Sequence, residues 1–258
     1  MTNLVDQTIA ELRANHDRLA AFVVDVEESQ LKGPSGASEW TVADVLSHLG
    51  SGAEIQRHTI AHALGDVSEA PPNQAVWDRW DALPPVEQAH AFVEADERLV
   101  ALYESLTDDQ RESTTVHLGF LPEPVPVVVP LALRLNEQTL HGWDARVGID
   151  PRATLDEEAA ELMFRHYATT TSFLLGFIGK SDRLAQTLRL AVRGYTLVID
   201  DGVTVEQGTL GTTATYVGPL EAVLRLLAGR LAPEQTPDDV RVTGNVTLDE
   251  LREVFPGY

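Results

Sequence analysis

The sequence predicts a mixed fold, with an N-terminal four-helix bundle over residues 1–150 followed by a small α+β domain over residues 151–258. In the first part, apolar residues recur at three- and four-residue intervals in four separate segments, which is typical of amphipathic helices. In the second part, apolar and polar residues alternate over short segments, which is typical of half-buried strands. With 258 residues, 43% of them hydrophobic, the chain can bury a sizeable core.

The first part contains four predicted long helices separated by loops. Thr41 with an acid three residues later, Asp44, is a helix-start signal, and the pair Pro84-Pro85 suits the first turn of another helix. Residues 66–85 are expected to form a long loop with a short helical piece around Trp77. The predicted helices cover residues 4–28, 42–64, 85–106 and 131–147.

The second part is expected to open with one long helix over residues 156–178. Asp201-Gly202, between two alternating segments, is a strong signal for a hairpin turn. Strands are predicted at residues 188–192, 195–200, 203–206 and 212–217, followed by a helix at 219–227 and a last strand and helix within 240–255.

Charge and cysteine content exclude several classes of function. With 40 acidic against 19 basic residues the formal charge is −21, so neither nucleic acid nor an anionic membrane surface is an expected partner. The chain has no cysteine, which excludes disulfides, thiolate metal ligands and a cysteine nucleophile. No secretory signal is visible, and no apolar stretch approaches the ~20 residues of a membrane span. We therefore expect a cytoplasmic protein.

Three polar residues of the last predicted bundle helix share one face. Glu137, His141 and Asp144 stand at i, i+4 and i+7, within an arc of roughly 60°. This arc lies beside the apolar positions Leu133 and Leu140, so it should face a crevice of the bundle. Glu and His one turn apart have the spacing of two ligands to one cation.

The spacing alone is weak evidence, because Asp44/His48 and Glu54/His58 have it too, and by itself it favours a solvated or capped surface pair over a metal site. His48 adds to the case for a metal site. It stands at the edge of the apolar stripe of its helix, about 60° from Val45, where a bundle helix can direct a ligand toward its neighbour.

The other histidines are expected to have other roles. His58 and His62 lie opposite the apolar stripe and should form a solvated face with Glu54. His16, inside an apolar stripe, is expected to be buried with a backbone partner, and pocket lining is the alternative. Three histidines have no partner at metal-ligand spacing, although His117 is also a candidate for lining a pocket: His90, His117 and His166.

Two segments carry a resemblance to a known family. WTVADVLSHL at residues 40–49 and RLNEQTLHGWD at residues 134–144 resemble the mycothiol-dependent maleylpyruvate isomerase family, a branch of the DinB-like metal-binding four-helix bundles. Members of this family join such a bundle to a C-terminal domain that resembles sterol carrier proteins. Residues 218–230 and 242–244 are similar to parts of that second domain.

The resemblance implies a metal-dependent enzyme. By it, His48, Glu137 and His141 are the three ligands of Zn²⁺ or another divalent metal, with a position left open. A small thiol in that position, mycothiol in this family, would ionise and act as the nucleophile that the chain itself lacks. The thiolate would then isomerise a small electrophilic substrate or be transferred to it. Asp144 would orient a ligand or a cofactor group, and a purely structural acid is the alternative.

Two rival functions remain open at this point. The metal could activate water, which would make the protein a hydrolase. The bundle could also hold a metal for stability or sensing without catalysis, with His16 or His117 as a fourth ligand.

The second domain is expected to close over the crevice of the bundle and to contribute substrate or thiol contacts. Arg230, in a Gly229-Arg230 pair after the helix at 219–227, is the first candidate to bind a carboxylate of the thiol or the substrate. Arg193, next to Gly194, is the second candidate. The alternative for Arg230 is a favourable charge at a helix C-terminus.

Overall fold

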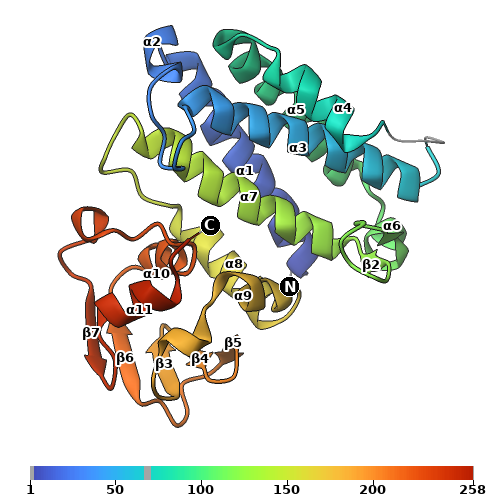
Figure 1. The fold of residues 1–258 in the computed structure, drawn as a ribbon. Helices are drawn as coiled ribbons and strands as arrows, with labels where there is room; N and C mark the ends of the chain where they lie inside the picture. The colour runs from blue at the N-terminus through green and yellow to red at the C-terminus, as the bar shows by residue number, and fades with distance from the viewer. Residues whose placement is uncertain (1–2, 67–70, 258) are drawn as a thin grey trace. The chain divides into compact units, whose positions relative to one another are not determined.

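The computed structural model describes residues 3–66 and 71–257, and the chain divides into two compact units, Met1–Ala153 and Thr154–Tyr258. The first unit is helical, and the second combines a sheet with helices (Figure 1). The predicted four-helix bundle followed by a small α+β domain is therefore confirmed. None of the helices in the described parts of the chain has both the length and the apolar character needed to cross a membrane.

Four long helices form the bundle of the first unit. α3 packs against α5 and α7, and α1 packs against the same two helices, which closes the bundle. Leu12, Leu46, Phe92 and Leu135, one from each helix, are fully buried in its core. The helices are α1 (Leu4–Asp25), α3 (Val42–Ala63), α5 (Pro85–Ser105) and α7 (Val128–Val147).

Local signals set the starts of these helices. The Thr41 hydroxyl accepts a hydrogen bond from the Asp44 N–H, and the Asp44 carboxylate accepts one from the Thr41 N–H, as the sequence predicts for α3. Pro85 is the first residue of α5. α7 begins at Val128, earlier than expected, with Pro130 inside its first turn. A proline is tolerated there because first-turn N–H groups have no acceptor within the helix.

Short elements connect the long helices. The helix predicted over residues 4–28 is wrong at its end, because α1 stops at Asp25 and Glu27 caps a separate turn, α2. α6 was not predicted, although Thr107 and Gln110 form a capping box at its start. The connecting elements are α2 (Glu28–Leu31), α4 (Asn73–Asp81), α6 (Asp108–Ser113), β1 (Thr115–Val116) and β2 (Val125–Pro126), and β1 pairs with β2.

The loop predicted over residues 66–85 is described in part. Its residues 67–70 lie outside the described residues. The helical piece expected around Trp77 is α4, in which Trp80 is buried against the bundle.

The second unit contains a five-stranded mixed sheet in the order β5-β4-β3-β6-β7. β3 and β6 run parallel, and the other neighbours run antiparallel. The hairpin predicted at Asp201-Gly202 is confirmed, since it joins the antiparallel pair β4 and β5. The strands are β3 (Leu188–Val192), β4 (Tyr195–Ile199), β5 (Val203–Gln207), β6 (Ala214–Val217) and β7 (Arg241–Gly244). The helices are α8 (Glu157–Ala168), α9 (Phe173–Ile178), α10 (Leu220–Leu227) and α11 (Leu248–Val254), with 3-10 turns η1 (Ser181–Arg183) and η2 (Pro233–Gln235).

The single helix expected over residues 156–178 is wrong, because the segment forms two helices, α8 and α9. The helix ends at Thr169, whose backbone angles, φ −135° and ψ −69°, are not helical. This threonine begins a run of three threonines and a serine, and its hydroxyl donates to the Arg165 carbonyl at 2.7 Å. Hydroxyl side chains that bond the nearby backbone, together with β-branching, disfavour continuation of a helix.

Candidate metal centre

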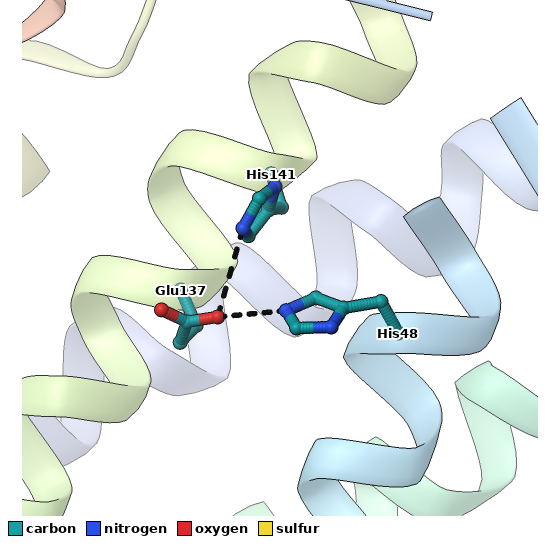
Figure 2. Close-up of side chains that lie close together, drawn as sticks. All are labelled: His48, Glu137 and His141. Atoms are coloured by element: carbon teal, nitrogen blue, oxygen red, sulfur yellow. Dashed lines mark hydrogen bonds and ion pairs between the residues drawn. The ribbon is translucent and has the colours of Figure 1, made fainter. Parts of the chain in front are cut away.

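His48 on α3 and the pair Glu137 and His141 on α7 point toward one another (Figure 2). His48 Nε2 lies 2.9 Å from Glu137 Oε2, and His141 Nε2 lies 3.7 Å from the same oxygen. One potential ligand atom from each side chain lies within 4.8 Å of the other two. The packing of α3 against α7 thus brings together residues that are about ninety positions apart in the sequence.

The three side chains fit a divalent cation. Two imidazole nitrogens and a carboxylate oxygen are common ligands for such an ion, and three protein ligands leave a position open. Burial raises the pKa of the Glu137 carboxyl, but the hydrogen bond with His48 and the charges of His141, His48 and Arg134 lower it below its usual value overall. Glu137 is therefore ionised at neutral pH, as a ligand must be.

Asp144 supports the centre from within the protein. It is fully buried, and its Oδ2 accepts a hydrogen bond from His141 Nδ1 at 2.8 Å. A carboxylate on one ring nitrogen directs the other nitrogen toward a metal and increases its basicity. The orienting contact expected of Asp144 is therefore present in the structure.

The Trp40 indole lies against the rings of both histidines. Its ring centroid lies 5.1 Å from that of His48 and 5.9 Å from that of His141, and it stacks on the latter. The indole remains 38% exposed. The sequence analysis did not assign a role to Trp40, although its position directly before the Thr41 cap placed it near His48, two helical turns away.

The loop that carries Trp40 is fixed against the end of α7. The Gly36 N–H donates to the Asp144 carbonyl at 2.8 Å. A Cβ at Gly36 would lie 2.6 Å from a methyl of Val147, and a Cβ at Gly148 would lie 2.3 Å from the Pro34 carbonyl oxygen. Glycine at both positions therefore permits a contact between the loop and α7 that a side chain would prevent.

A pocket of about 420 Å³ opens beside the centre, and His48 and Glu137 form part of its wall. The rest of the wall comes from α3, α7, the segment after β1 and Asn73 at the start of α4. His117 lines this pocket, which was one of the possibilities considered from the sequence. In the described residues, however, neither His117 nor His16 belongs to the cluster that could hold an ion. A buried arginine, Arg134, also lines the pocket, and the sequence analysis missed it.

His16 is buried as expected, but the expected backbone partner is wrong. Its Nδ1 lies 2.9 Å from Asp96 Oδ2 and its Nε2 lies 3.0 Å from Glu97 Oε2, so two carboxylates of α5 hold the ring. A buried ring nitrogen needs a hydrogen-bond partner, and here each of the two nitrogens has a carboxylate beside it. The carboxylates lie eighty positions further along the chain, so helical spacing carried no signal for this contact.

The solvated face expected for His58, His62 and Glu54 is wrong for Glu54. The carboxylate accepts a hydrogen bond from Trp80 Nε1 at 3.0 Å and pairs with Arg79. α4 packs on this side of α3 and covers the acid. His62 is exposed and His58 is half-buried.

The two candidate arginines of the second unit lie at turns. Arg230 follows α10, and its Nη1 donates to the Ala228 carbonyl at the end of that helix at 3.0 Å. Arg193 occupies the tight turn between β3 and β4 with a positive φ of 41°, and its Nη1 pairs with Glu157 at 2.9 Å. The contact of Arg230 corresponds to the helix-end role considered from the sequence.

Fold and site together define a helical-bundle protein with a candidate metal centre made by two histidines and a glutamate. The family model described as Mycothiol maleylpyruvate isomerase N-terminal domain matches residues 12–146, which is more than half of the chain. The chain therefore belongs to this family, as the resemblance indicated.

Relatives and solved structures extend this finding. Two proteins of Mycobacterium tuberculosis, Uncharacterized protein MT0763 of strain CDC 1551 / Oshkosh and Uncharacterized protein Rv0738 of strain ATCC 25618 / H37Rv, are each 28% identical over 159 residues, covering 60% of this chain and 74% of theirs. Crystal structures of the mycothiol-dependent maleylpyruvate isomerase and of a histidine-to-alanine mutant of it each superpose over 100% of both chains, with a TM-score of 0.66 at 16% identity. At this identity the structural likeness shows a shared fold.

Proposed function

We propose that this chain is a metal-dependent enzyme that uses a low-molecular-weight thiol, mycothiol, as its nucleophile to isomerise a small electrophilic substrate or to transfer the thiol to it. The observation that carries the proposal is the His48, Glu137 and His141 cluster at the wall of a pocket, in a chain without cysteine. A nucleophilic thiol must then come from outside.

The chemistry follows from the donor set. A divalent ion held there, zinc by the family resemblance, would lower the pKa of a bound thiol so that it reacts as a thiolate. Glu137 would supply the negative charge that holds the ion, and Asp144 accepts the hydrogen bond from Nδ1 of His141. For isomerisation, the bound thiol would supply a nucleophile for reversible addition to an activated double bond, which would allow that bond to rotate before the thiol is released.

Two rival functions make different predictions. A hydrolase would consume its substrate with water and without thiol. A non-catalytic metal-binding or sensing bundle would bind the ion and turn nothing over. The absence of His16 and His117 from the described cluster favours a site with an open position over one closed by a fourth protein ligand.

The experiment compares metal content and turnover in three proteins: wild type, His48→Ala and the control His58→Ala, a histidine of the same helix outside the cluster. Maleylpyruvate, the substrate that names the solved relatives, is tested with and without mycothiol. We expect about one metal ion per chain and thiol-dependent turnover in wild type and control, and loss of both in His48→Ala. Turnover without thiol would support the hydrolase, and metal binding without turnover on any tested electrophile would support the non-catalytic bundle.

Arg230 remains a proposed contact for a carboxylate of the thiol or the substrate. Arg230→Lys separates this role from a helix-end role, because a helix end needs only the charge, whereas a bidentate contact needs the guanidinium. Unchanged thiol binding and turnover in Arg230→Lys would exclude the proposed contact.

A further inference from the structure

We infer that the pocket beside the metal centre binds a small organic monoanion with an apolar body, and that Arg134 holds its anionic group. The inference rests on the proposed function for the reacting end of this molecule, which would lie at His48 and Glu137. Its recognition by Arg134 stands on separate observations.

Arg134 is a buried cation with unused hydrogen-bonding capacity. It lies on α7 one turn before Glu137, and its side chain is only 3% exposed. Nη2 donates to Asp96 Oδ1 at 2.6 Å, whereas Nε has no hydrogen-bond partner among residues 3–66 and 71–257. A guanidinium carries five N–H donors, so burial of one with so few partners is costly unless a ligand completes the set.

Gly52 opens the pocket toward this guanidinium. Gly52 lies in the interior of α3 and lines the pocket together with Arg134. A Cβ built at Gly52 would meet Arg134 Nη1 at 3.5 Å and nothing else within 4 Å. Glycine is unfavourable inside a helix, and here its missing side chain leaves Nη1 facing the pocket.

Arg134 is not the only group that contacts the Asp96 carboxylate. The same carboxylate also faces His16 Nδ1 at 2.9 Å and accepts from Gln138 Nε2. The two oxygens of Asp96 are therefore divided among Arg134, His16 and Gln138.

The other residues that line the pocket indicate how many anionic groups the ligand has and what kind of body it has. Among the described residues of the wall, Arg134 is the only arginine or lysine and Glu137 the only acid, and Glu137 belongs to the metal centre. One cation suits one anionic group. The apolar part of the wall suits a hydrocarbon or aromatic body and consists of Ile55, Leu118, Phe120 and Leu133.

The test measures binding of three probes to the zinc-loaded protein by calorimetry, with no thiol present and no turnover. trans-Cinnamate has an apolar body and one carboxylate, cinnamamide has the same body without charge, and fumarate has two carboxylates and no apolar body. We expect cinnamate to bind at least about tenfold more tightly than either of the others, as a charge-assisted contact plus apolar burial predicts.

Gly52 variants locate the carboxylate. Gly52→Val should cover Nη1 and reduce the preference for cinnamate over cinnamamide to about twofold or less, and Gly52→Ala, whose Cβ alone would lie 3.5 Å from Nη1, should reduce it by a smaller factor. Arg134→Lys should also lose most of the preference, because the single nitrogen of a lysine paired with Asp96 cannot also take the place of Nη1 beside Gly52. If Arg134→Lys does not fold, the Gly52 pair decides.

Two outcomes would overturn the inference. Equal binding of cinnamate and cinnamamide to wild type would show that no cation recognises the carboxylate. A preference that survives Gly52→Val but disappears in His48→Ala would place the carboxylate on the metal. Neither outcome depends on thiol-dependent turnover, so the inference and the proposed function can fail independently.

Discussion

The Asp144 carboxylate accepts a hydrogen bond from His141 Nδ1 at 2.8 Å while being fully buried itself. This contact holds the imidazole in the tautomer and orientation that direct Nε2 toward Glu137. The centre is therefore built from two layers of residues, the three that could meet an ion and the acid that holds one of them.

Removing this acid should weaken metal binding. We expect Asp144→Ala to lower the affinity for zinc by about 10- to 100-fold, in the range found for residues that orient a ligand. Asp150→Ala, which changes an exposed acid just beyond the same helix, serves as the control and should bind zinc like wild type. Competition with a chromophoric chelator measures the affinity, and equal affinities in the two variants would exclude an orienting role for Asp144.

Trp40 should contribute to the same site by restricting the two imidazole rings that it covers. We expect Trp40→Ala to lower the affinity for Co²⁺ several-fold, up to about tenfold, because both rings gain rotational freedom that binding must then remove. Trp40→Phe should retain most of the affinity, since a phenyl ring still covers the histidines. The visible absorption of bound Co²⁺ reports both occupancy and geometry.

Trp77→Ala is the matched control for this experiment. Trp77 on α4 is 42% exposed, close to the 38% of Trp40, and among the described residues the tryptophan that contacts the rings of His48 and His141 is Trp40. If Trp77→Ala weakens Co²⁺ binding as much as Trp40→Ala does, the effect is a general loss of packing and Trp40 does not position the ligands.

Helical spacing predicted the parts of the fold and site that depend on one helix or one turn. Glu137, His141 and Asp144 share a face because they lie on α7, and Thr41 with Asp44 caps α3, so the sequence alone indicated both. The family resemblance, rather than periodicity, joined His48 to this set.

Contacts between distant segments carried no such signal. His16 meets Asp96 eighty positions away, and Arg134 lies beside Gly52 on another helix. Neither contact joins residues at a helical or strand spacing, so periodicity in the sequence could not predict it. The break at Thr169 was missed for a different reason, because apolar periodicity continues across it while hydroxyl side chains interrupt the backbone pattern.

Replacing the buried Asp96 should cause a large loss in the free energy of unfolding. Burial raises the pKa of its carboxyl, but the charge of Arg134 and the hydrogen bonds from His16 and Arg134 lower it overall, so the group is ionised and paired. Asp96→Ala leaves the buried Arg134 and His16 without this partner, and we expect a loss of about 3–5 kcal/mol in the free energy of unfolding. Glu94→Ala, an exposed acid on the same helix, should change it by less than about 0.5 kcal/mol. Urea unfolding of both variants tests this, and a loss under about 1 kcal/mol for Asp96→Ala would contradict it.

His166 should make the stability of the second unit depend on pH. It lies on α8 at 2% exposure, and burial, with a smaller effect from the charge of Arg165, lowers its pKa to about 4 from 6.5. Above pH 6.5 the ring is neutral in the folded and unfolded chain, so it adds no pH dependence. Between pH 6.5 and 4 the unfolded chain takes up a proton that the folded chain does not, so stability falls as the pH falls.

The expected loss through His166 is about 2 kcal/mol between pH 7 and pH 5, from about 1.4 kcal/mol per pKa unit. His166→Gln, which cannot titrate, should remove this part of the pH dependence, and His62→Gln, at an exposed position, should leave it unchanged. Hydrogen exchange of the β3 and β4 amides reports the stability of the second unit by itself. Carboxylates titrate in both proteins, so their contribution to the pH dependence cancels when the variant is compared with wild type. A His166→Gln protein that loses as much stability as wild type from pH 7 to pH 5 would mean that the imidazole takes up its proton in the folded state, and burial would then not exclude the charge.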